Sequence, residues 1–278
     1  MAKLKNYPTN YPIKLMNLIQ KHQQTFPLNQ GINTLQVWHT FDQLLGLQIL
    51  SDIQGDVLEI GVLQGATIAF LCCSLQNQER AFLLDPYQDI EAVKQVVSEF
   101  SEVDASRILT YPIDSRIVAK RHSQLLGNYN PFFRFVHIDG EHSYDAVYSD
   151  IDLSYKYLAN GGLIVLDDIF NIASACCTQA MFDYLKSNPN LQCVAIGFNK
   201  GYLCESKYIG IYRKFFLSLP SVLAEEGLHI RLCFNDWAYE RGYLTFHSVN
   251  EGEPKYQAIN KICFSLDEIC DYLDVACQ

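Results

Sequence analysis

From Asp56 onward, short apolar runs alternate with amphipathic segments, and this alternation limits the fold more than any other feature of the sequence. The apolar runs are DVLEIG, AFLLD, RILTYPID, FRFVHID and GGLIVLDD. The segments between and after them predict helices that begin at Ala66, Ser115 and Tyr144, and helices near 89–101 and 174–187. Strands and helices that alternate in this way form a parallel sheet covered on both faces. The sequence therefore predicts a doubly wound α/β fold.

Two further apolar runs, LQCVAIGF and YLCESKYIGIY, are joined by the turn-like NKG and predict a hairpin. With it the sheet becomes seven-stranded and mostly parallel, with an antiparallel edge strand. We expect three segments: N-terminal helices in 1–50 (about 12–25 and 34–50), a core in 51–214, and a C-terminal extension in 215–278. The extension has apolar runs at LHIRLCF, YLTFHSV and AINKICF and a last helix near 266–276.

Composition narrows the class of protein. The formal net charge is -10, which disfavours nucleic acid as a partner because such binding depends on clustered Lys and Arg. There is no apolar run of about 18 residues that would span a membrane, and the first residues lack the features of a signal peptide. The ten cysteines contain no CxxC pair, so we expect buried free thiols. These features predict a cytoplasmic, ordered protein.

Acids and glycines follow the predicted strands at the ends where open α/β folds bind ligands. Glu59, Gly61 and Gly65 lie in VLEIGVLQGAT, where the chain must bend tightly before a helix. Leu63 occupies the place of the middle glycine in a GxGxxG motif, and this weakens a pyrophosphate interpretation. Glu59 would repel phosphate, so a cationic or zwitterionic ligand fits better. The pattern indicates a nucleotide-type ligand that is not a dinucleotide.

The next two strands end in Asp85 and in Asp114-Ser115. Asp85 could accept hydrogen bonds from ribose hydroxyls, and Asp114 from an exocyclic amine. Taken alone, each residue is as well explained as a turn or helix-cap residue, and for Asp114 or Ser115 a simple cap is the better explanation. The repetition of acids at one edge of the sheet favours a binding site.

A second group of acids ends the last two parallel strands: Asp139 follows FRFVHI, and Asp167 and Asp168 follow GGLIVL. Two carboxylates about 4 Å apart repel by about 4 kcal/mol at an effective dielectric near 20, so converging acids need a proton, a basic partner or a cation. Arg134, the nearest basic residue in sequence, lies one strand length from Asp139. All-oxygen ligation favours Mg²⁺, Mn²⁺ or Ca²⁺. The alternatives are that Asp167 or Asp168 caps the next helix or closes a turn, or that the acids form a solvated rim.

Two histidines accompany these acids. His142 lies three residues after Asp139, at the start of a predicted helix, where its ring could reach the same cleft. His137 shares the strand face of Asp139, which leaves open a role in orienting that acid, although packing is the better explanation. His142 is therefore the candidate for proton transfer.

The segments VLEIGVLQGAT, LLDPY, PIDS, HIDGEHSYDAVYSDI and LANGGLIVLDD resemble the class I S-adenosylmethionine-dependent methyltransferases. More narrowly, residues of about 50–213 resemble the metal-dependent O-methyltransferases that include macrolide-sugar enzymes. The resemblance implies a Rossmann-like fold, and it implies that Glu59, Gly61 and Gly65 surround the methionine part of the cofactor, with Thr67 among the binding residues. It places Asp85 at the ribose, Asp114 and Ser115 at the adenine, the metal at Asp139, Asp167 and Asp168, and the general base at His142.

The expected activity is O-methylation of a small hydroxylated acceptor: a sugar, a polyol or a catechol-like natural product. S-adenosylmethionine and Mg²⁺ (or Mn²⁺ or Ca²⁺) would be required, with His142 and Asp139 as catalytic residues. Two alternatives stay open: a metal-independent small-molecule methyltransferase, and a metal-dependent hydrolase or nicotinamide oxidoreductase on a similar sheet. No membrane partner is expected, and a homo-oligomer is left open. The aromatic residues around Trp38 to Phe41 and in the tail (Phe234, Trp237, Tyr239, Tyr243) predict core packing by default, or an acceptor pocket or interface.

Overall fold

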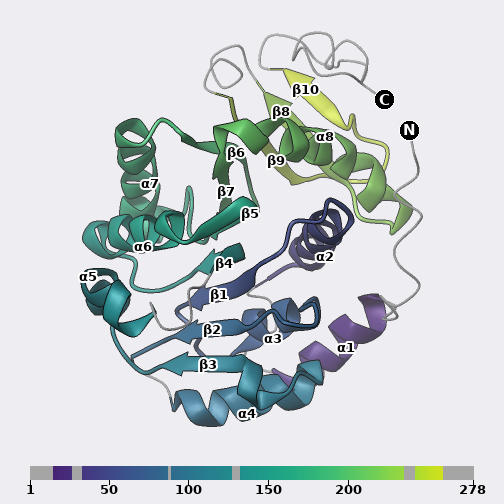
Figure 1. Cartoon of the computed structure of the whole chain (residues 1–278). Helices are drawn as coiled ribbons and strands as arrows, with labels where there is room; N and C mark the ends of the chain where they lie inside the picture. Colours follow the sequence, from purple (N-terminus) through teal and green to yellow (C-terminus); the bar gives the residue numbers. More distant parts are fainter. Residues whose placement is uncertain (1–14, 27–32, 87–88, 127–131, 235–241, 259–278) are drawn as a thin grey trace.

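The computed structural model describes residues 15–26, 33–86, 89–126, 132–234 and 242–258. The strands in these ranges form one sheet in the order β10-β8-β9-β6-β7-β5-β4-β1-β2-β3, with helices on both faces (Figure 1). A hydrophobic core lies on each side of the sheet. The structure confirms the predicted doubly wound, mostly parallel α/β class.

The five central strands come from the five apolar runs that the sequence pattern identified. They are β1 (Asp56–Ile60), β2 (Ala81–Leu84), β3 (Ile108–Tyr111), β4 (Phe133–Ile138) and β5 (Leu158–Leu166), and all four neighbouring pairs are parallel. Helices cover both faces of these strands, so their sequences are nearly continuous apolar runs instead of alternating ones. Parallel pairing brings their carboxyl ends, with the candidate site residues, to one edge.

The helices divide between the two faces of the sheet (Figure 1). One face carries α5 (Ser115–Leu125), α6 (Tyr144–Lys156) and α7 (Ala175–Ser187). The other carries α1 (Leu15–Thr25), α2 (Leu35–Leu50), α3 (Ala66–Cys72), α4 (Ile90–Ser101) and α8 (Ile209–Glu225). Short 3-10 turns lie at η2 (Ala105–Arg107), η3 (Ile172–Ser174) and η4 (Ser206–Tyr208). In α2 the aromatic pair Trp38 and Phe41 is buried, so these rings belong to the core.

The predicted hairpin consists of β6 (Leu191–Gly197) and β7 (Lys200–Glu205), which pair antiparallel. Its turn residues Phe198 and Asn199 have φ values of 53° and 65°, as in the two-residue type I′ turns whose twist matches that of the strands. β7 also pairs antiparallel with β5. The turn therefore lies at the same edge of the sheet as the ends of the parallel strands.

The sheet has ten strands, not the seven expected. In the extension, β9 (Leu244–Ser248) pairs with β6, β8 (Ile230–Phe234) with β9, and β10 (Tyr256–Ala258) with β8. If β6 were the outermost strand, the backbone N–H and C=O groups on its outer side would have no partner strand. β9 pairs with these groups. The hairpin therefore lies between other strands and does not form the outermost strand of the sheet.

The run YLCESKYIGIY is only partly a strand. β7 ends at Glu205 and the chain enters α8 at Ile209, because buried Tyr212, Phe216 and Leu219 continue at helical spacing. The expected boundary between 214 and 215 falls within α8, and the three-segment division stays a prediction. The last helix near 266–276 and the aromatic residues Trp237 and Tyr239 lie outside the described residues.

Arg134 is completely buried in β4, at the opposite end of the strand from Asp139. Its Nε lies 3.0 Å from Glu79 Oε1, and its guanidinium donates to the carbonyl of Ser74 at 2.9 Å. Gln48 of α2 donates to the Arg134 carbonyl at 2.6 Å. This confirms that Arg134 is out of reach of Asp139, and the pairing anchors α2 and the end of α3 to the sheet.

The cysteines among the described residues are free thiols, as expected, but only Cys72, Cys177, Cys193 and Cys204 are buried, and the other three are partly exposed. No helix in the described part of the chain has the length and apolar character needed to cross a bilayer.

Candidate functional site

The loop between β1 and α3 is shaped by two glycines with left-handed φ values, 81° at Gly61 and 83° at Gly65. A Cβ atom on Gly61 would lie 2.0 Å from the carbonyl oxygen of Asp139, so the loops after β1 and β4 touch there. Leu63, at the position of the missing middle glycine, also has a positive φ of 49°. This close approach joins the candidate cofactor loop directly to the first acid of the second group.

Glu59 lies beneath this loop and is buried. Its Oε2 accepts from the amide of Ile68 at 3.0 Å, and its Oε1 lies 2.9 Å from His137 Nδ1. Burial raises the pKa of Glu59, against the opposing effect of His137. The carboxylate thus holds the start of α3 in place, with Thr67 buried one residue before its amide partner.

Asp85 follows β2 and binds the loop between β1 and α3, here called the glycine loop. Its Oδ2 accepts from the amides of Val62 and Leu63 at 2.9 and 3.0 Å. Two charge-assisted hydrogen bonds to backbone amides fix a loop more firmly than neutral ones. Asp85 therefore positions the loop on which a ligand would lie.

Asp114 is the N-cap of α5, and Ser115 is its first residue. The Asp114 carboxylate accepts from the Arg116 amide at 2.8 Å and lies 2.6 Å from the Arg116 guanidinium, which lowers the pKa of Asp114. Arg116 also lies 2.8 Å from Glu141. Arg116 thus links the loops after β3 and β4, a link that sequence reasoning did not identify.

The second group of acids, here called the acid corner, comprises Asp139, Asp167 and Asp168. His142 lies between two of them: its Nε2 is 3.0 Å from Asp168 Oδ2 and 3.5 Å from Asp139 Oδ1. The hydrogen bond with Asp139 raises the pKa of His142, aided by the charge of Asp168 and opposed by partial burial. The structure therefore brings the predicted base and acids together.

Lys200, the first residue of β7, supplies a cation to the acid corner. Its Nζ lies 2.5 Å from Asp167 Oδ2, and its side chain is only 2% exposed. Burial would raise the pKa of Asp167, but the charges of Lys200 and His137 outweigh it and the pKa is lowered. Sequence reasoning missed Lys200 because only neighbours in sequence were considered. The signal was NKG: if β7 runs antiparallel beside β5, its first residue lies at the end of β5.

Two asparagine amides orient Asp168. Asn199 Nδ2 donates to Asp168 Oδ1 at 2.9 Å, and Asn171 Nδ2 donates to the same oxygen. Asp168 itself has a left-handed φ of 60°, a conformation that non-glycine residues keep mainly where the surroundings impose it. Oδ1 is thereby held, and Oδ2 faces His142. Neither asparagine was identified from the sequence.

His137 lies between Glu59, beneath the glycine loop, and Asp167 of the acid corner. Its ring is completely buried, with Nδ1 bonded to Glu59 and Nε2 lying 3.9 Å from Asp167 Oδ2. Nε2 has no hydrogen-bond partner. His137 is therefore more than a packing residue, because it lies between the cofactor loop and the acid corner.

Residues 58–169 match the model of a family described as "Methyltransferase domain". The matched range begins in β1 and ends directly after Asp168, so it contains the glycine loop, Asp85, Asp114 and the acid corner. The family match and the geometry therefore concern the same part of the chain.

Solved structures share the fold of this chain. The O-methyltransferase NovP is 12% identical with a TM-score of 0.51, and the match covers 68% of this chain and 98% of that one. The cofactor-bound protein Rv0187 from MTB is 18% identical with a TM-score of 0.51, covering 68% and 89%. At these identities the likeness concerns the fold alone. No curated protein matches the sequence.

The acid corner and the neighbouring histidines have ligand atoms that fit a hard divalent cation. The nearest ligand atoms of Asp139, Asp168 and His142 lie within 4.8 Å of one another, and carboxylate oxygens are the ligands that Mg²⁺ and Ca²⁺ prefer. The same distance limit holds for His137, Asp139 and Asp167. Both oxygens of Asp167 are, however, occupied by Lys200 and by the amide of Asp168. In Asp168, Oδ1 is likewise bound by Asn171 and Asn199, and Oδ2 faces His142. Asp139 and the Oδ2 atom of Asp168 are thus the more available ligand groups.

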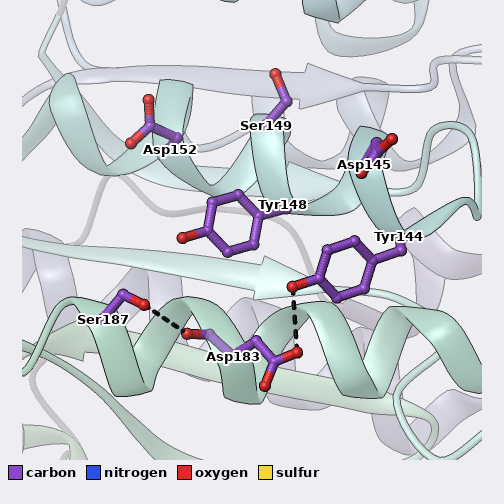
Figure 2. Close-up of a pocket in the computed structure, with 7 residues that line it drawn as sticks. All are labelled: Tyr144, Asp145, Tyr148, Ser149, Asp152, Asp183 and Ser187. Carbon is purple, nitrogen blue, oxygen red and sulfur yellow. Dashed lines mark hydrogen bonds between the residues drawn. The ribbon is translucent and has the colours of Figure 1, made fainter.

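A separate surface pocket lies between α6 and α7 (Figure 2). Tyr144 and Tyr148 stack with ring centroids 5.9 Å apart, and the Tyr144 hydroxyl donates to Asp183 at 3.1 Å. Its lining contains none of the predicted site residues: Tyr144, Asp145, Tyr148, Ser149, Asp152, Asp183 and Ser187. The candidate site is therefore at the carboxyl ends of the parallel strands and not in this pocket.

Proposed function

We propose that the chain is an S-adenosylmethionine-dependent O-methyltransferase that acts, with a divalent metal, on a hydroxyl of a small molecule. The observation that carries the proposal is the juxtaposition at Gly61, where the loop expected to hold the methyl donor touches Asp139 of the acid corner. A donor and an acceptor held in adjoining sites react faster because alignment supplies several kcal/mol of the barrier. The family match over residues 58–169 and the fold shared with the O-methyltransferase NovP support the same reaction class.

The cofactor half of the site would bind the donor with residues that the fold already arranges. Glu59, Gly61, Gly65 and Thr67 are proposed to surround the methionine part, because Glu59 places negative charge beneath the loop, where a sulfonium and an ammonium group are favoured. Asp85 is proposed to bind the ribose. Asp114 and Ser115 are proposed at the adenine, where Asp114 is already paired with Arg116.

Asp139 and Asp168, with Asp167, would hold the divalent cation. Bound there, it would act as a Lewis acid that lowers the pKa of the acceptor hydroxyl. Mg²⁺, Mn²⁺ and Ca²⁺ all suit such oxygen ligands. Asn171 and Asn199 contribute by fixing Asp168, as hydrogen-bonded carboxylates around metal sites generally require.

His142 is proposed as the general base. The acceptor oxygen forms its bond to the methyl carbon as the carbon–sulfur bond breaks, and its proton passes to His142 Nε2. Asp168 orients the ring from one side, and Ser174 Oγ lies 3.3 Å from Nδ1 on the other. The base must be neutral to accept the proton, so activity should rise with pH through the pKa of His142.

Metal-independent methyl transfer is a second candidate, and one observation favours it. The acid corner contains its own cations, with Lys200 at 2.5 Å from Asp167 and His142 at 3.0 Å from Asp168. The repulsion between converging carboxylates is thus already reduced. In this case Lys200 and His142 would supply the positive charge without a metal ion.

Calorimetric titration with S-adenosylhomocysteine, with and without Mg²⁺, tests the proposal first. We expect binding in both conditions, followed by methyl transfer to glycosides, polyols or catechols that a chelator abolishes and added Mg²⁺ restores. Transfer that survives chelation selects the metal-independent candidate. Absence of S-adenosylhomocysteine binding together with clear NAD or phosphate-ester binding would overturn both candidates in favour of an oxidoreductase or hydrolase.

A further inference from the structure

The loop after β5 presents two large apolar side chains to solvent beside the acid corner. Ile172 is 99% exposed and Phe170 is 56% exposed, and they follow Asp168 within four residues. Single exposed apolar residues are ordinary on protein surfaces. A fully exposed isoleucine next to a second exposed apolar residue and a cluster of ionisable groups indicates instead a surface that binds something apolar.

Hydrogen bonds on several sides hold this loop in place. The Ile169 amide donates to the carbonyl of Asn199 at 2.9 Å, and the Phe170 amide donates to Thr178 Oγ1 at 2.7 Å. Asn171 Oδ1 accepts from the Ala173 amide at 2.9 Å. Phe170 has a φ of 64°, which bulky residues rarely adopt. The fold thus maintains an unfavourable backbone conformation that turns these side chains outward.

Phe170 also begins a row of aromatic rings. Its centroid lies 6.4 Å from that of Phe182 on α7, which lies 5.9 Å from that of Tyr243 before β9. Phe182 and Tyr243 are both partly exposed. Ring spacings of this size are typical of attractive aromatic pairs. We call these three aromatic residues, together with the exposed Ile172 of the same loop as Phe170, the apolar platform (Phe170, Ile172, Phe182, Tyr243).

We propose that the apolar platform binds the ring system of the acceptor, so that the acceptor is a hydroxyl group carried on an apolar ring body and not a free polyol. The inference rests on the proposed function, since the acceptor is defined by methyl transfer. Phe170 lies two residues from Asp168, so a ring bound on the platform would lie near the acids that are proposed to act on the hydroxyl. Contact with the platform would hold the hydroxyl in line with the donor.

Two diols with the same reacting groups and different ring sizes test the inference. Pyrocatechol and naphthalene-2,3-diol are titrated by calorimetry into the protein saturated with S-adenosylhomocysteine and Mg²⁺. Burial of the second ring should make naphthalene-2,3-diol bind roughly tenfold more tightly. Phe170→Ala and Ile172→Ser should each remove much of this difference and leave S-adenosylhomocysteine affinity unchanged.

Phe132→Ala is the matched control, because Phe132 is 54% exposed but precedes β4 at the opposite edge of the sheet. It should not alter the affinity of either diol. Ile172 is almost fully exposed, so its replacement leaves the core intact and keeps the test valid if Phe170→Ala folds poorly. Equal binding of the two diols, no binding of either, or unchanged selectivity in the variants would overturn the inference. Failure of S-adenosylhomocysteine to bind would instead contradict the proposed function.

Discussion

The carboxylates in the two halves of the candidate site, the cofactor side and the acid corner, have different kinds of hydrogen-bond and ion-pair partners. On the cofactor side, Glu59, Asp85 and Asp114 each accept hydrogen bonds from backbone amides near the start of a helix or within a loop. At the acid corner, Asp167 and Asp168 are bound chiefly by the side chains of residues from other elements, namely Lys200, His142, Asn171 and Asn199.

On the cofactor side, the backbone amides therefore fix the position of the carboxylates. At the acid corner, the side chains of other elements balance the charge of the carboxylates. Backbone amides cannot move without deforming the loop, so the cofactor half is fixed before a ligand arrives. At the acid corner, a bound metal ion can take the place of a cationic side chain at a lower cost in free energy. We therefore expect the cofactor half to bind its ligand in the absence of metal, and the acid corner to carry the dependence on metal and pH.

Replacement of Asp139 should have the largest effect, because Asp139 is the acid of the corner that lacks a lysine or an asparagine partner among the described contacts. Asp139→Ala is expected to reduce the rate of methyl transfer on the order of 10³-fold, while S-adenosylhomocysteine affinity changes little. Asp145→Asn, an exposed substitution on α6, serves as control. Full activity of Asp139→Ala would contradict the catalytic assignment.

Lys200→Met should destabilise the fold strongly. Removing one partner of a buried ion pair leaves the other charge uncompensated and costs about 3–5 kcal/mol, measured as the free energy of unfolding in urea. The double variant Lys200→Met with Asp167→Asn should recover part of the loss.

Lys207→Met is the matched control for that measurement. Lys207 follows the same strand and pairs with Glu205 at 3.2 Å, but its side chain is 55% exposed. Its loss should cost less than about 1 kcal/mol. Equal effects of the two lysine substitutions would show that burial of the Lys200 pair is unimportant.

Asp85→Ala probes the cofactor half. Loss of an ionised acceptor for two loop amides should weaken S-adenosylhomocysteine binding by about 10- to 100-fold, with no change in metal affinity measured separately. Asp104→Ala removes a similar acid–amide bond (2.8 Å to Ser106) before β3 and should leave binding unchanged. A loss of metal affinity in Asp85→Ala would show that the two halves are not independent.

The smallest effect is the titration of His142, followed by NMR in metal-free protein. Because Asp139 and Asp168 favour the imidazolium, its midpoint should lie above the ordinary 6.5. Asp139→Asn should lower it. The pairing stabilises the folded state fully below pH 6.5 and is lost as pH rises through the raised pKa. Because the His142 side chain is 44% exposed, the contribution of this pairing to the free energy of unfolding is small. A midpoint at or below 6.5 would show that the carboxylates do not raise the pKa of His142.

The parallel core and the position of the acids and glycines that follow its strands could be predicted because their signals are local. Continuous apolar runs predict buried strands, and an acid or glycine directly after such a run predicts a residue at the binding edge. The expected grouping of Asp139, Asp168 and His142 followed from the same rule. These residues depend on the ends of their own strands and on little else.

The rest could not be predicted because it depends on pairings between distant segments. Lys200 reaches Asp167 only because β7 is antiparallel to β5, and Asn199 reaches Asp168 only because the hairpin turn lies there. The strand count was too low because nothing in YLTFHSV indicates that β9 pairs with β6. The run after Glu205 was misinterpreted because aromatic and β-branched residues favour strands, while the helical spacing lies further along the chain.

The two-residue turn at Phe198 and Asn199 limits how the length of this chain can be altered. A strand whose pairing slips by one residue turns every side chain to the opposite face, so one inserted residue here would send the Lys200 amine away from Asp167 and the Asn199 amide away from Asp168. Length changes belong instead in the exposed turn at 250–253, beyond β9. A protein engineer who lengthens loops to change acceptor range should treat the turn at 198–199 as invariant in length and the outer turn as the place to vary.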